Sequence, residues 1–376
     1  MTHLSTIVIP AEPVWWWVGG LIIVILTVLI LPFKLKWCEH NLELFFLIMG
    51  ILAVSISRQW SGELVVNALK APVMIGSLPI GIFQVVLVFG LLIYFFYGPF
   101  CRGVQSVVNK LSITIFIFLL VLVLGLVSSI ISVIVTSVIL AEIITVLPLK
   151  RNDRIKLAVV ACFSLGLGAV LTPLGEPMST ILVQRLSGAP YFAGFTWPIS
   201  HFALFIIPSC LVLSIFAAFW IGRKSGLAAS AETGSADITI HHHTDTLRLV
   251  VMRAVKVFAF VAALVLLGDG LKPLIQWFFI EVPALALFWI NIISAILDNA
   301  TLTAVEINGQ MLLPQIIAVV LGLLIAGGML IPGNIPNIVA AARLRISMRE
   351  WAVIGLPIGL AIMVIYFLIL LATGHI

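Results

Sequence analysis

The sequence is poor in charged residues. Only 9% of its 376 residues are Asp, Glu, Lys or Arg, whereas 62% are hydrophobic. A water-soluble protein of this length needs many more charged side chains to cover its surface, so a soluble enzyme or carrier is excluded. Several apolar runs exceed the roughly 18–20 residues that cross a bilayer as a helix, and they do not alternate as barrel strands do. The sequence predicts an all-α polytopic membrane protein.

The sequence also lacks cysteine pairs and catalytic motifs. Its cysteines, Cys38, Cys101, Cys162 and Cys210, are scattered singly, which argues against a disulfide framework and a zinc site. No HExxH, GxSxG or Walker-type motif is present, so we expect neither enzymatic activity nor a cofactor. The net charge of +5 does not indicate nucleic-acid binding, and the distribution of the charges serves instead as a topology signal.

The most informative feature is a matched pair of interruptions within the most apolar runs. They lie at residues 168–177, GAVLTPLGEP, and at residues 327–336, GGMLIPGNIP. Both have Gly five residues before the first Pro and a second Pro four residues after it. Such residues break a helix, and in lipid the freed backbone groups must face protein or a wet cavity. Helices broken at corresponding positions are the best sequence pointer to the substrate site of a transporter.

The apolar runs divide the chain into related blocks. We expect spans near residues 14–32, 41–57, 76–98, 111–147, 157–188, 195–222, 249–268, 271–308, 312–342 and 351–373. The fourth and eighth runs are too long for one crossing, so each is predicted to form a helical hairpin, either fully crossing or re-entrant. The predicted parts are an N-terminal scaffold, a first repeat, a polar linker, a linking span and a second repeat, at residues 1–110, 111–222, 223–248, 249–270 and 271–376.

The distribution of Lys and Arg predicts how these blocks are oriented. With the N-terminus outside and each hairpin returning to its own side, every Lys and Arg lies on the cytoplasmic side except Arg58, Lys70, Arg185 and Lys272. The two repeats then have opposite orientations, which defines an inverted-topology repeat with a site expected at its midplane interface. The linker 223–248 is predicted to be cytoplasmic.

Each predicted hairpin carries the same group of polar positions. The first has Ser132, Thr136 and Ser137, and the matching positions of the second are Ser294, Asp298 and Asn299. Residues four apart share a helix face, so these oxygens gather on one side and suit sodium or a hydrated proton. The alternative for the three hydroxyls of the first hairpin is that they bond back to their own helix or join neighbouring helices.

Asp298 and Glu176 are the leading acidic candidates. A carboxylate deep in an apolar segment costs roughly 2.5–3.5 kcal/mol on insertion scales and normally persists only with a partner or a function. Glu176 lies inside the first break, and the matching position of the second break is Asn334. The alternative for both acids is a helix cap or a buried hydrogen-bond acceptor. Protons and sodium can compete for such a group, because burial and a bound cation act on its charge in opposite directions.

Other polar residues are weaker candidates. Glu142 and Glu306 lie near the ends of the two hairpins and are secondary candidates for ion binding, the alternative being that each reaches the membrane interface. His241, His242 and His243 form a run in the linker that could bind a metal ion, but a solvated loop is the simpler interpretation.

These motifs resemble those of the ion transporter superfamily, which includes NhaD-type sodium/proton antiporters, arsenite permeases and divalent-anion symporters. The similarity rests on residues 294–301, with the Asp298-Asn299 pair, and on residues 327–337. Within that superfamily, the chain looks most like a small prokaryotic family described only as predicted cation transporters and formerly as a domain of unknown function. The similarity covers the two repeat blocks, about two thirds of the chain.

The resemblance implies paired re-entrant hairpins, two unwound helices, a homodimer and elevator-like motion of a transport domain. By motif match, the second repeat would line the ion site with Asp298, Asn299, Thr301, Asn334 and Asn337, and the first with Ser132, Thr136, Ser137, Thr172 and Glu176. The sequence departs from the pattern of the superfamily at two places that affect which ion would bind. Thr136-Ser137 stands in the first repeat where the second repeat has the acidic-amide pair Asp298-Asn299, and Glu176 stands where relatives often carry a neutral residue.

The sequence therefore favours a secondary active transporter of a small inorganic cation, with sodium exchanged for protons across a prokaryotic cytoplasmic membrane. Asp298 and Glu176 are the predicted charged ligands of the transported cation, since hard cations prefer oxygen. One alternative is an anion or dicarboxylate transporter that uses the dipoles of the half-helices. Another is an intramembrane enzyme or a metal-sensing membrane protein that uses the histidine run.

Overall fold

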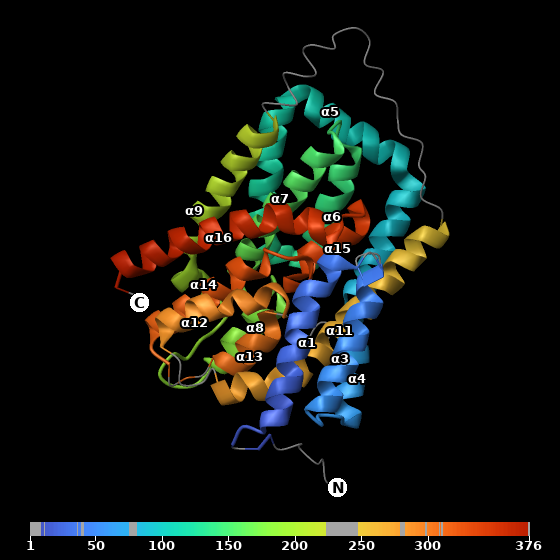
Figure 1. The fold of residues 1–376 in the computed structure, drawn as a ribbon. Helices are drawn as coiled ribbons and strands as arrows, with labels where there is room; N and C mark the ends of the chain where they lie inside the picture. The colour runs from blue at the N-terminus through green and yellow to red at the C-terminus, as the bar shows by residue number, and fades with distance from the viewer. Residues whose placement is uncertain are drawn as a thin grey trace.

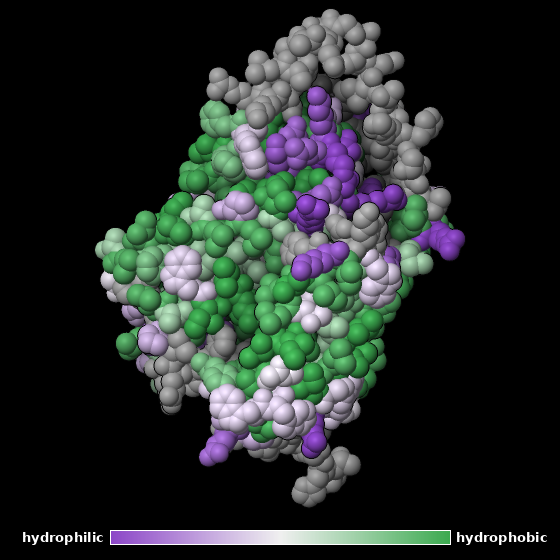
Figure 2. Space-filling model, viewed as in Figure 1, coloured by the Kyte–Doolittle hydropathy of each residue, from purple (hydrophilic) through white to green (hydrophobic). Residues whose placement is uncertain are grey.

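The computed structural model describes residues 9–10, 12–35, 37–38, 41–74, 81–222, 247–278, 283–297, 299–307, 309 and 311–374. Over these residues the regular secondary structure is helical, without a strand, and 5 helices are long and apolar enough to cross a membrane. Figure 2 shows a largely hydrophobic surface, with the main group of hydrophilic side chains in the upper part of the view. These features confirm the coarse expectation of a membrane-embedded helical protein.

A group of N-terminal helices packs around one long helix from the middle of the chain. The group consists of α1 (Trp15–Lys34), α3 (Leu42–Ile56) and α4 (Gly62–Lys70), and the long helix is α11 (Leu247–Phe278). Helix α11 contacts all three and lies most extensively against α3 (Figure 1). We name these four helices the scaffold group.

Helix α11 is longer than the sequence suggested. The expected span ended at residue 268 and the second hairpin began at residue 271, but the helix runs without interruption to Phe278. The reason is that Gly270 serves helix packing instead of ending a helix. A Cβ atom added to Gly270 would meet the Ala53 Cβ and the Val54 nitrogen at 2.6 Å, and one added to Gly50 would meet the Ala263 carbonyl oxygen at 2.9 Å. Small residues let the two backbones approach closely, as is common between membrane helices.

The first half of the remaining chain forms a hairpin, a broken helix and a closing helix. Its elements are α5 (Ile82–Ile131), α6 (Val133–Val146), α7 (Arg151–Ala169), α8 (Pro177–Arg185), α9 (Trp197–Ala217) and the π-helical η1 (Ala218–Gly222). Helix α5 departs from helical geometry at Phe96 and Ser112. The chain turns at Ser132, where φ is 97°, and α6 packs back against α5.

The second half repeats this order of elements. It consists of α12 (Ala284–Ile290), the 3-10 helix η2 (Asn291–Ala295), α13 (Asn299–Glu306), α14 (Leu313–Gly327), the 3-10 helix η3 (Ile331–Gly333), α15 (Ile335–Leu344) and α16 (Met348–Ala372). Helix α14 and η3 both contact η2, so the second break lies against the turn of the second hairpin.

The first arms of the two broken helices form the core. Every residue from 157 to 169 in α7 and from 316 to 327 in α14 is buried. A helix that is apolar on all faces is stable only when other helices surround it. Helices α7 and α14 contact each other, and the remaining elements of both halves cover them (Figure 1).

The two halves also exchange contacts through their short helices. The second arm of the first hairpin, α6, packs against α15, which follows the second break. In the same way, the second arm of the second hairpin, α13, packs against α8, which follows the first break. Each break therefore leads directly into a helix that rests on the hairpin of the opposite half.

Candidate functional site

Both predicted helix breaks are confirmed. The first separates α7, ending at Ala169, from α8, beginning at Pro177, and the second separates α14, ending at Gly327, from α15, beginning at Ile335. At the second break, the Asn337 side-chain amide donates to the carbonyl oxygens of both Gly327 and Leu330, each at 2.8 Å. One buried amide thus holds the two sides of the break together.

Asn299 and Ser294 bring the second hairpin to this break. A Cβ atom added to Gly327 would lie 2.7 Å from the Asn299 Nδ2 atom and 2.9 Å from its Oδ1 atom. A Cβ atom added to Gly333 would lie 2.7 Å from the Ser294 carbonyl oxygen. The Ser294 hydroxyl donates to the Leu323 carbonyl at 2.9 Å, which fixes the hairpin turn on α14. Only glycine leaves room for this approach of amide and carbonyl groups.

Several polar atoms at this point lack a hydrogen-bond partner in the described part of the chain. They are the Oδ1 and Nδ2 atoms of Asn299 and the Oδ1 atom of Asn337. Asn299 is 3% exposed and Asn337 is fully buried, so bulk water does not satisfy them. A buried polar atom without a partner is costly, and such an atom in a native protein calls for an explanation such as a bound ion or water. We name Ser294, Asn299, Gly327, Gly333 and Asn337 the second-break cluster.

The second-break cluster can hold a small cation through oxygen. Amide and carbonyl oxygens are ligands that hard cations accept. Across the described residues, no group of three or more His, Cys, Asp and Glu side chains gathers in a metal-binding arrangement. Among the described residues, the second-break cluster therefore offers a cation neutral amide and carbonyl oxygens.

Some of the predicted site residues lie outside the part of the chain that the structure describes. Asp298, the predicted charged ligand, lies outside the described residues, although its neighbours Leu297 and Asn299 are both buried. The Thr301 side chain and residues 223–246, which include the run His241–His243, also lie outside them. Asn334 is described: its Oδ1 atom accepts from the Ile335 nitrogen at 2.8 Å and caps α15.

The first break is closed by hydrogen bonds within the protein. The Thr172 hydroxyl donates to the Ser129 carbonyl, and the Ser179 hydroxyl donates to the Val170 carbonyl at 2.9 Å. The Val133 nitrogen, next to the hairpin turn, donates to the Gly175 carbonyl at 2.8 Å. Carbonyl groups that the break frees from the helix thus accept hydrogen bonds from other groups of the protein.

The hydroxyls of the first hairpin bond back to their own chain. Thr136 donates to the carbonyls of Ser132 and Val133 at 3.1 and 3.2 Å, and Ser137 donates to the Ile134 carbonyl at 2.8 Å. The Ser132 hydroxyl oxygen accepts from the Ile134 nitrogen at 3.3 Å. This is the alternative raised for these three residues, and it is the arrangement that local serine and threonine hydrogen bonding favours in helices.

Glu176 lies at the N-terminus of α8 as its N-cap residue. Its side chain is buried. The partial positive charge of a helix N-terminus favours a carboxylate at this position. The first break thus places an acidic side chain where backbone dipoles stabilise its negative charge, which agrees with its candidacy as a charged group of the site.

The secondary candidates, Glu142 and Glu306, are both buried within the protein. Glu142 is buried and its Oε1 atom lies 2.6 Å from the Arg343 Nε atom, an ion pair between α6 and α15 with side-chain exposures of 4% and 12%. Glu306 is also buried, at the end of α13. Their burial follows from the packing of α6 against α15 and of α13 against α8, which the sequence did not reveal.

A cavity of about 770 Å³ opens between the scaffold group and the second half. Its wall includes Glu43 of α3 and Lys256 of α11 on one side, and residues of α15 on the other. Ile331 of η3 also lines it, so the cavity extends to the second break. Lys256 and Glu43 are ion-paired at 2.7 Å, which leaves the wall polar at this level.

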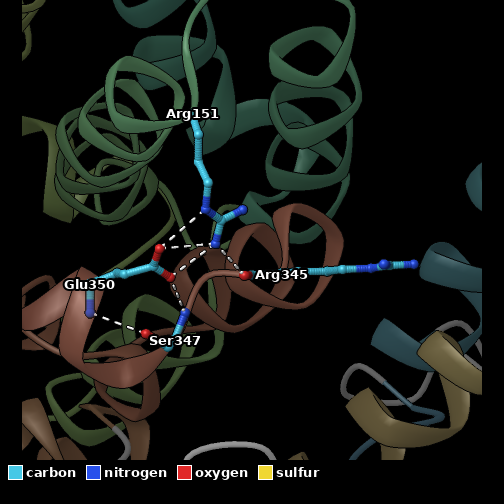
Figure 3. Close-up of polar contacts among 4 residues, drawn as sticks. All are labelled: Arg151, Arg345, Ser347 and Glu350. Atoms are coloured by element: carbon cyan, nitrogen blue, oxygen red, sulfur yellow. Dashed lines mark hydrogen bonds and ion pairs between the residues drawn. The ribbon is translucent and has the colours of Figure 1, made fainter. Parts of the chain in front are cut away.

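The far wall of the cavity is a polar network between the starts of α7 and α16. Figure 3 shows the Arg151 guanidinium contacting both carboxylate oxygens of Glu350 at 3.0 Å and donating to the Arg345 carbonyl at 2.9 Å. Glu350 in turn accepts from the Ser347 nitrogen at 2.9 Å and closes a capping box. The Arg345 side chain extends away from this network, and the residue adopts a left-handed conformation at the end of α15.

Sequence reasoning missed two residues of this region. Asn291 is fully buried, its Nδ2 atom donates to the Val319 carbonyl at 3.3 Å, and its Oδ1 atom has no hydrogen-bond partner among the described residues. Its spacing of three residues from Ser294 was the available signal, since both side chains face α14. The sequence indicates for Arg343 only a place on the cytoplasmic side, and no local signal predicts its pairing with Glu142, 201 residues away.

Comparison with known proteins gives a family but no activity. A model of the family described as "Protein of unknown function (DUF1646)" matches residues 18–373 of the chain. The search of curated proteins found no match.

Proposed function

Since the chain belongs to the DUF1646 family, which is described as of unknown function, we propose a function from the site itself. The protein is a secondary active transporter of a small inorganic cation, which it exchanges for protons by alternating access. Sodium is the proposed cation. Asp298 and Glu176 supply the negative charges, and the second-break cluster supplies neutral oxygens.

One observation carries the proposal. The second-break cluster gathers buried amide atoms without partners beside the carbonyls of a broken helix. A packed protein core without a ligand would not retain such atoms, because each buried polar group without a hydrogen-bond partner costs about 1–3 kcal/mol. A cation that enters and leaves can offset this cost at the two oxygen atoms, Asn299 Oδ1 and Asn337 Oδ1, only while it is bound, which is the requirement for a transported ion.

The arrangement of the halves supports alternating access. Their elements recur in the same order, and α6 and α13 pack against the post-break helix of the opposite half. We interpret this as an inverted repeat whose two broken helices meet around one site, the arrangement found in many secondary transporters. The scaffold group then acts as the fixed part against which the repeat domain moves.

The cavity offers a route to the site. It reaches Ile331 of the second break and is bounded by Arg151, Lys256 and Arg345. The distribution of positive charge predicts that these residues face the cytoplasm, and we propose that the cavity is the cytoplasmic route to the site. We place the protein in a prokaryotic cytoplasmic membrane as a multi-pass homodimer, with the linker 223–248 in the cytoplasm.

The test is a flux assay with purified protein in proteoliposomes. A pH-sensitive dye reports dissipation of an imposed pH gradient when sodium, lithium, potassium or calcium is added outside. We expect a response to sodium that is lost in Asp298→Asn, because the variant keeps the size of the side chain and removes its charge. Absence of a response to every cation in the unmodified protein contradicts the proposal.

A second candidate function is transport of an anion such as a dicarboxylate. The observation in its favour is the set of basic residues around the cavity, Arg151, Lys256 and Arg345. Two of them are already ion-paired, Arg151 with Glu350 and Lys256 with Glu43. Uptake of a labelled organic acid that is independent of sodium and insensitive to Asp298→Asn would favour this candidate over cation exchange.

A further inference from the structure

Glu306 is a buried carboxyl group without a satisfied partner. The residue ends α13, is 7% exposed, and neither of its carboxylate oxygens accepts a hydrogen bond of normal geometry from a described residue. The side chain of Asn291 approaches it. The Asn291 Nδ2 atom is already directed to the Val319 carbonyl, and its Oδ1 atom is the one left without a partner.

This arrangement suits a carboxyl group that carries a proton. A charged carboxylate buried without a cation or donors is strongly unfavourable, whereas a protonated carboxyl has one O–H group to donate. The ionised form would need several donors, and the described residues supply none of normal geometry to either carboxylate oxygen. Glu142 shows the contrast, because its charge is balanced by Arg343 at 2.6 Å.

No described charged group neutralises Glu306. The elements packed against α13 are α8, α11 and α14. Helix α14 has no charged residue, and the charged residue of α8, Arg185, is exposed. Near its C-terminal end, α11 carries Asp269 and Lys272, which are ion-paired with each other. Among the described residues, no cationic side chain therefore balances a negative charge on Glu306, which favours the protonated form.

Glu306 is linked to the second-break cluster by a single short helix. Asn299, Thr303 and Glu306 are spaced four and three residues apart and share one face of α13. The Thr303 hydroxyl donates to the Asn299 carbonyl at 2.8 Å. Seven residues of helix correspond to about 10 Å, so the carboxyl group is separate from the cluster, although both groups are held by the same element.

Building on the proposed function, we propose that Glu306 is the proton-carrying group of the exchange, distinct from the cation ligands and coupled to them through α13. A cation at the Asn299 end and a proton at the Glu306 end each satisfy unmet groups on this helix. Because both bind the same short element, each can bias its position against α8 and α14, which is the condition for coupling two sites.

The experiment separates proton coupling from cation transport in Glu306→Gln. Proteoliposomes are assayed for sodium-driven proton movement and, at equal pH on both sides, for exchange of radioactive sodium against unlabelled sodium. We expect sodium-driven proton movement to fall by roughly tenfold or more while sodium/sodium exchange persists. Glu63→Gln, the same change in α4 at a position the site does not use, is the matched control and leaves both rates unchanged.

The outcomes distinguish this inference from the proposed function. Proton movement that persists in Glu306→Gln overturns the inference while the transporter proposal stands. Loss of both exchange modes in a variant that elutes as a monodisperse peak also overturns it, because the residue would then serve cation binding. Absence of both modes in the unmodified protein overturns the function and the inference together.

A second variant, Glu306→Asp, tests the inference if Glu306→Gln does not fold. Glu306→Asp keeps an ionisable group but shortens the side chain by one methylene, so its distance to Asn291 changes. We expect coupled exchange to continue with its half-maximal pH shifted by about half a unit or more. An unchanged pH profile would show that the proton is carried elsewhere.

Discussion

The two halves of this protein share an order of helices but differ in how their polar groups are satisfied. In the first half, Thr136, Ser137 and Thr172 donate to backbone carbonyls nearby, and the break is tied to the hairpin turn by the Val133–Gly175 hydrogen bond. In the second half, Asn299 and Asn337 keep amide atoms without partners in the described part of the chain.

The same contrast holds for the buried acids at the ends of the hairpins. Glu142 in the first half is paired with Arg343, whereas Glu306 in the second half has no satisfied partner. Matching sequence positions therefore do not imply matching chemistry. In the proposed exchange, the unpartnered atoms of Asn299, Asn337 and Glu306 in the second half are the groups that a cation and a proton would satisfy.

The largest expected effect is on stability, from replacing Arg343, the positively charged side chain of the buried ion pair with Glu142. Arg343→Leu leaves the Glu142 carboxylate buried without its partner, which should lower the free energy of unfolding by about 3–5 kcal/mol. Arg185 lies at the end of α8, the helix after the first break, and is exposed. Arg185→Leu should therefore change the free energy of unfolding by less than about 0.5 kcal/mol. Denaturant unfolding in detergent micelles measures the free energy of unfolding of both variants. Equal losses of stability would contradict the proposed difference between the two halves.

The next effect is on cation transport. Asn299→Ala removes amide atoms that face the second break, so we expect sodium flux to fall about 10- to 100-fold, the equivalent of roughly 1.4–2.8 kcal/mol. Ser137→Ala alters the aligned position of the first half, where the hydroxyl only bonds back to its helix. Its flux should stay within about twofold. Similar losses in both variants would show that the first hairpin also binds the ion.

A smaller effect is expected from the paired glycines that open the two breaks. Gly327→Ala places a methyl group 2.7 Å from the Asn299 amide and should raise the KM for sodium by about tenfold in a folded protein. In Gly168→Ala, the methyl group instead presses on the Gly125 backbone, so thermal stability should fall while the KM of the remaining folded protein is unchanged. A KM effect at Gly168 alone would reverse the comparison.

The sequence was sufficient for features set by local chemistry. The breaks follow from prolines and glycines that cannot continue a helix, and the turn at Ser132 follows from a run too long for one crossing. The sequence does not show the role of Gly270, because a glycine can end a helix or admit a neighbouring helix. Only its contact with Ala53 of α3 decides between these.

The chemistry of the candidate site depended on partners far away in sequence. Thr172 bonds to Ser129 across 43 residues, and Glu142 pairs with Arg343 across 201. A sequence shows which groups can form hydrogen bonds but not which of them find a partner after folding. Which of these polar groups are paired and which are left without a partner was therefore available only from the structure.

The most direct measurement is an experimental structure of the purified protein soaked with thallium, a heavy monovalent cation whose anomalous scattering locates it without ambiguity. The account predicts a peak in the second-break cluster, between Asn299, Asn337 and the carbonyls of Gly327 and Gly333, that sodium displaces. A peak confined to the first break beside Thr172 and Ser179, with none in the second, would contradict it.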